Sequence, residues 1–258
     1  MNKGLRLMQA GLFRKKGANQ GMKLTTVLFD LDGTLLPMDQ DQFIKGYFGA
    51  LIRKFAPLGY EPAKMQSALM AGIGVMLKNN GSMTNEEAFW FAFEKTFPQA
   101  AADKAQFDAF YQNEFQSVQN CCGFDEHAAS LVRGLREMGL RVVLATNPLF
   151  PVAATHSRIR WAGLNPEDFE WVTTYENERF CKPNPAYYES ILERIGVSAE
   201  ECLMIGNDVQ EDMIAQQLGM KVFLLTDCLI NRAGEDTEQY PNGSLAEAKT
   251  YIVNLMTK

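Results

Sequence analysis

Short apolar runs recur along this chain and predict the strands of a buried sheet. The runs are rich in β-branched and aromatic residues and do not alternate strictly with polar positions. That pattern is typical of parallel strands that are covered on both faces. The runs lie at residues 25–30, 141–146, 169–174, 202–206 and 221–226.

Helical periodicity fills the intervals between the later runs. Residues 126–138 carry apolar side chains at helical spacing, and residues 185–196 open with a proline and close with a glycine. A third helical pattern, residues 212–219, precedes the last run. Strands that alternate with helices predict an α/β fold built on a parallel sheet. Ligands of such sheets bind at the carboxyl ends of the strands, so the residues after each run are the candidates for function.

One long interval, residues 39–120, contains no good strand and predicts a helical cap. Thr84 and Glu87 have the spacing of a capping box at the start of one of its helices. The helical patterns lie at 43–55, 62–79, 84–97 and 102–118. We expect the aromatic side chains of the third pattern to form the core of the cap. They are Phe89, Trp90, Phe91, Phe93 and Phe97.

These patterns divide the chain into three parts. Residues 22–38 and 121–258 form the α/β core domain, residues 39–120 form the cap domain, and residues 1–21 form a basic N-terminal extension. The extension holds five basic residues and no acidic one, and it lacks the hydrophobic segment and cleavage site of a secretory signal. We expect it to be a frayed end rather than a membrane or partner helix.

Charge and composition narrow the classes of partner. The 258-residue chain has a formal net charge of −6, which argues against a general affinity for nucleic acid or anionic membranes. No apolar stretch approaches the roughly 18 residues of a membrane span. Five cysteines without metal-binding spacing, and no export signal, favour a cytoplasmic location with free thiols.

Polar and charged residues follow several of the predicted strands. Asp30 and Asp32 follow the first, Thr146 and Asn147 follow the second, and Asp208 and Asp212 follow the fourth, while Lys182 lies in a loop after the third. Carboxylates gathered at one sheet edge repel each other unless a cation lies among them. A hard cation with few carboxylates and retained waters is typically Mg²⁺. With Lys182 and Thr146 as partners for anionic oxygen, the set predicts a phosphoryl-transfer site.

Four motifs in this order resemble the haloacid dehalogenase (HAD) superfamily. They are DLDGT at 30–34, TN at 146–147, KPNP at 182–185 and GNDVQED at 206–212. Asn207 departs slightly from the commonest wording of the fourth motif, but the spacing from Asp208 to Asp212 fits a variant of it. The resemblance implies a Rossmann-like core, a phosphatase activity and a helical type 1 cap.

The resemblance also implies a role for each residue. Asp30 would be the nucleophile that forms an aspartyl-phosphate, and Asp32 the general acid and base. Two residues apart on an extended strand, their side chains share one face. Asp30, Asp208 and the main-chain carbonyl of Asp32 would hold Mg²⁺.

Other residues would support this centre. Thr146 and Asn147 would hold the phosphoryl group, and Lys182 would balance its charge. Asp212 would orient Lys182 or a metal-bound water. Gly33 would permit a sharp turn, which Thr34 could cap.

Several interpretations of the function are compatible with these motifs. We expect hydrolysis of a small phosphorylated metabolite, such as a sugar phosphate or phosphoglycolate. A phosphomutase of the β-phosphoglucomutase type shares every motif named above, and a phospho-accepting signalling domain shares the nucleophile, the threonine and the lysine. The helical insert at 39–120 argues against a signalling domain. The sequence leaves the oligomeric state open.

Overall fold

A parallel sheet forms the centre of the fold. The structure, a computed structural model, describes residues 23–257, and in this part of the chain the sheet has six strands in the order β3-β2-β1-β4-β5-β6. The strands are β1 (Thr26–Phe29), β2 (Arg141–Leu144), β3 (Trp171–Val172), β4 (Cys202–Gly206), β5 (Lys221–Leu225) and β6 (Asn242–Gly243). The predicted α/β class with a parallel sheet is therefore confirmed.

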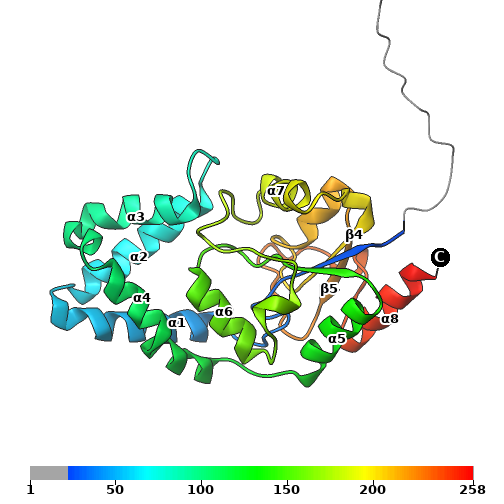
Figure 1. The fold of residues 1–258 in the computed structure, drawn as a ribbon, viewed down its shortest axis with the longest axis horizontal. Helices are drawn as coiled ribbons and strands as arrows, with labels where there is room; N and C mark the ends of the chain where they lie inside the picture. The colour runs from blue at the N-terminus through cyan, green and yellow to red at the C-terminus, as the bar shows by residue number, and fades with distance from the viewer. Residues whose placement is uncertain (1–22, 258) are drawn as a thin grey trace, which may run out of the picture.

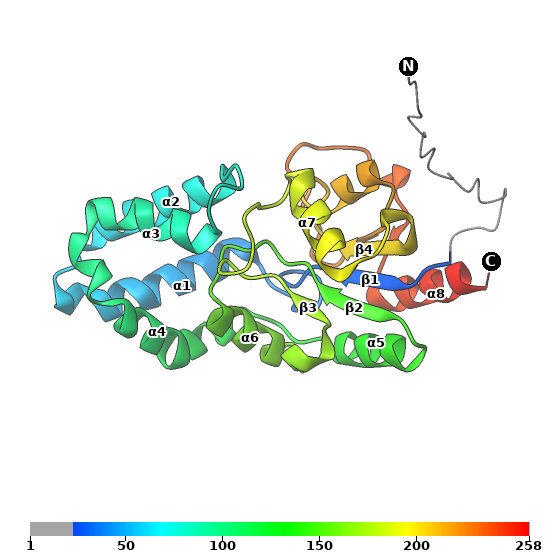
Figure 2. The ribbon, with the colours of Figure 1, turned by 45° about the horizontal axis from the view of Figure 1, so that its top comes forward.

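Helices cover both faces of the sheet (Figures 1 and 2). On one face, α7 (Pro185–Ile195) and the 3-10 helix Met213–Leu218 pack against inward side chains such as Leu28. On the other, α5 (Glu126–Glu137) and α8 (Leu245–Met256) pack against side chains such as Phe29. Neighbouring side chains of β1 thus pack into the cores on opposite faces of the sheet, because strand side chains alternate in direction. This double burial explains the continuous apolar runs.

A helical insert separates β1 from β2 and extends away from the sheet (Figure 1). Its helices are α1 (Gln40–Phe55), α2 (Pro62–Leu77), α3 (Asn85–Thr96) and α4 (Lys104–Gln112), followed by the 3-10 helix Glu114–Cys121. The fourth predicted helix, 102–118, is thus interrupted after Gln112. There the Asn113 side chain donates to the main-chain oxygen of Ala109 at 2.7 Å, and the Asn113 backbone leaves helical geometry.

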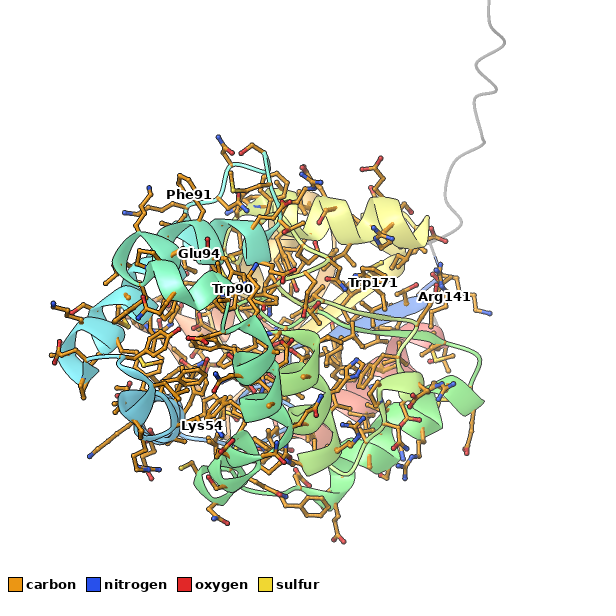
Figure 3. The ribbon with its side chains drawn as sticks, turned by 60° about the vertical axis from the view of Figure 1, so that its left-hand side comes forward. Lys54, Trp90, Phe91, Glu94, Arg141 and Trp171 are labelled. Carbon is orange, nitrogen blue, oxygen red and sulfur yellow. The ribbon has the colours of Figure 1, made fainter. Side chains whose placement is uncertain are left out.

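The aromatic residues of α3 form a core within the insert, with one exception. Trp90, Phe93 and Phe97 are buried, but Phe91 is 59% exposed. Figure 3 shows Phe91 on the outer side of α3, and the Lys95 ammonium lies 3.9 Å from its ring centroid. The expectation that all five aromatics form the core was wrong for Phe91, because it lies on the opposite side of the helix from Phe89 and Phe93.

Other local predictions had mixed outcomes. The predicted capping box of Thr84 and Glu87 is present, and Ser244 and Glu247 form a second one at the start of α8. Residues 213–218 form a 3-10 helix rather than an α-helix, and β6 was missed because its two residues, Asn and Gly, carry no strand signal. The basic extension 1–21 lies outside the described residues. No helix within residues 23–257 is long and apolar enough to cross a membrane. The three-part division of the chain stays a prediction.

Candidate active site

The carboxyl ends of three adjacent strands bring the predicted site residues together. β1 pairs with β2 on one side and β4 on the other. The main-chain N–H of Asp30 donates to Ile205 at 2.9 Å, which continues the ladder to β4 past the end of β1. Asp30, Thr146 and Asp208 therefore follow neighbouring strand ends, as parallel pairing requires.

Lys182 joins two of the predicted carboxylates. Its buried ammonium donates to Asp30 Oδ1 at 2.9 Å and to Asp212 Oδ1 at 2.6 Å. Burial disfavours the charge on Lys182, but the two carboxylates outweigh it and hold the pKa of Lys182 well above its ordinary value. Burial also raises the pKa of Asp212 to about 6, against the opposing effect of Lys182. This hydrogen bond holds Lys182 and Asp212 together, and the role predicted for Asp212 in the reaction stays a prediction.

Asp32 has a different partner, which the sequence did not reveal. Its Oδ2 accepts from the guanidinium of Arg158, a fully buried side chain on α6 (Val152–Trp161). The guanidinium also lies 4.2 Å from the ring centroid of Phe150 and donates to Thr155 Oγ1 at 3.3 Å. Burial raises the pKa of Asp32 to about 6, and Arg158 opposes that rise. Arg158 fixes the direction in which the Asp32 carboxylate points.

The turn after Asp32 depends on a glycine and a distant asparagine. Gly33 has a φ of 83°, and a Cβ there would lie 2.3 Å from Asn207 Nδ2. Thr34 Oγ1 donates to Asn207 Oδ1 at 3.0 Å, so Thr34 ties this turn to the loop after β4 instead of capping its own turn. Main-chain hydrogen bonds from Gly33 to Leu36 and from Thr34 to Leu31 close the turn itself.

Asp208 lies in a loop that orients both of its oxygens. Oδ1 accepts from the main-chain N–H groups of Gln210 and Glu211, each at 2.9 Å. Oδ2 accepts from Arg232 at 2.6 Å, and the same guanidinium donates to Gln40 Oε1 at 3.0 Å at the start of α1. Arg232 was also missed, because it is an exposed side chain in a long loop with no motif around it.

Thr146 and Asn147 lie beside this centre. Thr146 is buried, and its main-chain oxygen accepts from Thr173 and Tyr187. Asn147 Nδ2 donates to Glu211 Oε2 at 3.0 Å, a contact that the sequence did not predict. Burial raises the pKa of Glu211 to about 7. The contact of Thr146 and Asn147 with a phosphoryl group stays a prediction.

The carboxylates of this site are the candidate ligands for a metal ion. Among residues 23–257, no group of three or more His, Cys, Asp and Glu side chains could hold one. Asp30 and Asp208 provide two carboxylates, and Asp30 Oδ2 accepts no hydrogen bond from the described residues. These donors are oxygens alone, with no His or Cys among them, and such a chemistry would fit Mg²⁺ and would not fit a softer metal.

Comparison with known proteins places this constellation in a family. Residues 24–219 match the family described as hydrolase, haloacid dehalogenase-like hydrolase. The chain belongs to this family. The resemblance drawn from the four motifs is confirmed, and the matched residues include every predicted site residue of this haloacid dehalogenase-like hydrolase.

Curated relatives carry phosphatase names. The chain is 26% identical over 162 residues to the sesquiterpene phosphatase astK of Aspergillus oryzae, covering 60% of this chain and 81% of that protein. It is 24% identical over 212 residues to the pyrophosphatase PpaX of Bacillus cereus, covering 82% of this chain and 88% of that protein.

Solved structures share the fold. A HAD phosphatase from Thermococcus onnurineus superposes with a TM-score of 0.56 at 21% identity, covering 89% of this chain and 98% of that one. The HAD-hydrolase YfnB from Bacillus subtilis, described as bound to magnesium, superposes with a TM-score of 0.53 at 22% identity. The match covers 89% of this chain and 99% of that one. At these identities the likeness concerns the fold alone.

Proposed function

We propose that this hydrolase is a Mg²⁺-dependent phosphatase that cleaves phosphate monoesters through an aspartyl-phosphate on Asp30. The observation that carries the proposal is the shared ammonium of Lys182, which holds Asp30 and Asp212 together at the carboxyl edge of the sheet. A buried cation beside a carboxylate nucleophile is suited to the negative charge of a phosphoryl group. The phosphatase names of the curated relatives support the same reaction.

The reaction divides into two displacements. An oxygen of Asp30 attacks phosphorus as the bond to the leaving oxygen breaks, and Asp32 gives that oxygen its proton. Asp32 then takes a proton from a water that attacks the aspartyl-phosphate, and inorganic phosphate leaves with Asp30 restored. Lys182 balances charge on the phosphoryl group, with Thr146 and Asn147 as its further contacts.

The metal has a defined place in this proposal. Asp30, Asp208 and the main-chain carbonyl of Asp32 would hold Mg²⁺. When bound, it would supply positive charge that lets anionic nucleophile and anionic substrate approach each other. The same charge explains how Asp30 and Asp208 tolerate each other at one edge.

Within this proposal, the presence of Asp32 and Asp208 favours phosphate esters over haloacids. The substrate would be a small phosphorylated metabolite, because side chains of the helical insert share a cavity wall with Asp32 and would enclose the bound ester. A phosphomutase remains the alternative, and transfer of phosphate to a second hydroxyl instead of water would identify one. The cytoplasmic location stays a prediction.

The test is phosphate release from p-nitrophenyl phosphate with Mg²⁺ and with EDTA. We expect turnover only with Mg²⁺ and a loss of at least about a thousandfold in Asp30→Asn, since the covalent route is then closed. Asp227→Asn is the matched control, because Asp227 is an exposed acid just after β5 at the same edge. Full turnover by Asp30→Asn, or equal turnover in EDTA, would contradict the proposal.

A further inference from the structure

A small cavity opens beside Asp32, between the site and the helical insert. Its volume is about 210 Å³, below the roughly 300–1,000 Å³ of most ligand pockets. Asp32, the proposed proton donor to the leaving oxygen, is part of its wall. The cavity is therefore placed to receive the leaving group.

Most of the cavity wall is apolar. Side chains from the segment just before α1, from α1 itself, from the end of α2 and from the loop after β2 meet there. They are Met38, Phe43, Ile44, Leu77, Leu149 and Phe150. Leu77 is 44% exposed, so its position contributes little to the core of the insert. An apolar side chain left open at a cavity is available to contact a ligand.

The polar groups of the wall are largely engaged with one another. Asn147 donates to Glu211, and Arg232 donates to both Asp208 and Gln40. The buried atoms of this wall without a hydrogen-bond partner in the described part of the chain are Asp32 Oδ1 and Asn147 Oδ1, both acceptors. These two acceptors could serve only two of the several hydroxyl groups of a sugar. A second phosphate would face the carboxylates of Asp32 and Glu211, while the Arg232 guanidinium is already paired with Asp208 and Gln40.

We infer that the leaving group is a compact apolar alcohol, a short hydrocarbon or a single aromatic ring, held in this cavity. The inference rests on the proposed function and narrows it to phosphate esters of such alcohols. An apolar leaving group binds more tightly because its hydrocarbon is removed from water in the cavity. Polyhydroxylated or anionic leaving groups bind less well there. The six apolar side chains, with Leu77 at the open end, set the length that fits.

The experiment measures kcat/KM for ethyl, butyl, hexyl and decyl phosphate with Mg²⁺, beside glucose 6-phosphate and pyrophosphate. Each methylene that enters the cavity should raise kcat/KM about fourfold, and the rise should stop once the chain exceeds the cavity. Glucose 6-phosphate and pyrophosphate should both be poorer substrates than butyl phosphate. Alkylphosphonates of the same lengths, as inhibitors, should show the same trend in Ki without any chemical step.

A matched pair of variants on α2 tests the site of the effect. L77Q replaces a cavity side chain, whereas M70Q replaces an exposed side chain of the same helix that does not line the cavity. The hexyl-to-ethyl ratio of kcat/KM, and of phosphonate Ki, should fall severalfold in L77Q and stay unchanged in M70Q. Because both positions are exposed, thermal melts should show both variants folded.

Three results would overturn the inference. One is an equal response to all chain lengths, and another is a preference for glucose 6-phosphate or pyrophosphate over butyl phosphate. The third is an unchanged chain-length dependence in L77Q. In each of these the proposed phosphatase function survives, because esters are still hydrolysed. If no phosphate ester, p-nitrophenyl phosphate included, is hydrolysed with Mg²⁺, the proposed function fails and this inference fails with it.

Discussion

Asp30 and Asp32 are two residues apart and have different buried cations as partners. Lys182 contacts Asp30, and Arg158 contacts Asp32. A carboxylate buried without a cation would become protonated, or its burial would destabilise the fold around it. Lys182 and Arg158 are therefore each required to keep their carboxylate ionised. The separate cations suit the separate tasks proposed for the two carboxylates, since a nucleophile at Asp30 must stay ionised while a proton donor at Asp32 must exchange a proton. In the proposed mechanism Arg158 acts through Asp32 and is a positioning residue.

Replacing Arg158 with methionine should affect poor leaving groups most. An alkoxide needs a proton as it leaves, whereas p-nitrophenolate does not, so misplacement of Asp32 should be felt mainly with alkyl esters. We expect kcat/KM to fall at least about tenfold more for butyl phosphate than for p-nitrophenyl phosphate. The control is Arg160→Met, an exposed arginine of the same helix.

Comparable losses with both esters in Arg158→Met, in a variant whose thermal melt shows it to be folded, would assign Arg158 a structural role alone. A selective loss in Arg160→Met would equally contradict the account.

The sequence predicted those site residues that follow strands or belong to motifs. Asp30, Asp208 and Lys182 could be found this way because parallel strands bring their carboxyl ends to one edge. Arg158 and Arg232 could not. Arg158 lies within an ordinary helical pattern, and its contact with Asp32 spans 126 positions of the chain. Contacts of this kind depend on how helices pack on the sheet, which local patterns do not encode.

At the scale of elements, the end of β4 is fitted tightly to the residue that orients Lys182. A Cβ at Gly206 would lie 2.1 Å from Asp212 Oδ2, and the same oxygen accepts from the main-chain N–H of Asp208 at 3.0 Å. Gly206 therefore lets the strand and the following loop approach closely. Any side chain there must displace Asp212, and with it Lys182.

Gly206→Ala should consequently reduce activity although it lies outside the proposed catalytic set. We expect a loss of kcat of about a hundredfold, because small displacements of positioned groups are costly, and a lowered melting temperature. Gly134→Ala on α5 is the matched control, since nothing lies within 4 Å of a Cβ at that position. It should keep full activity and gain about 0.5–1 kcal/mol in stability, as expected for alanine in a helix.

Wild-type kinetics in Gly206→Ala would show that Asp212 and Lys182 can move without consequence. Inactivation by Gly134→Ala would show that the assay reports general damage.

Elements differed in how well the sequence specified them. The β1, β2, β4 and β5 runs were found because burial on both faces makes them continuously apolar. β6 has two polar or small residues, and the helix predicted at 212–219 forms as a 3-10 helix. Short elements of this type are fixed by neighbouring packing and hardly at all by their own composition.

The molecule as a whole gathers acidic groups at one edge of the sheet, and its stability should therefore depend on pH. Burial raises the pKa of Glu211 to about 7 and those of Asp32 and Asp212 to about 6. A folded-state pKa above the unfolded value means that the folded protein binds more protons. The stability from these groups is therefore complete below about pH 4 and is lost as pH rises through 6–7. His156 acts in the opposite sense, since burial lowers its pKa.

Glu211→Gln should isolate one part of this effect. Measured in EDTA, the free energy of unfolding of the variant relative to the wild type should rise between pH 5 and pH 8, by up to about 3 kcal/mol. Glutamine keeps an oxygen for Asn147 and carries no charge to bury. Glu189→Gln, at an exposed position of α7, should show no such trend. A constant difference across this pH range would contradict the assigned cause.

The most direct test of the account is to locate the phosphoryl group on the enzyme during turnover. The wild type would be mixed with ³²P-labelled substrate and Mg²⁺, quenched in acid within the first turnovers, reduced with borohydride and mapped by mass spectrometry. The account predicts an acyl phosphate on Asp30, found as homoserine at that position, and none in Asp30→Asn. Homoserine at another position, ³²P that stays bound to another residue after reduction, or continued turnover with no covalent phosphate at any quench time would contradict it.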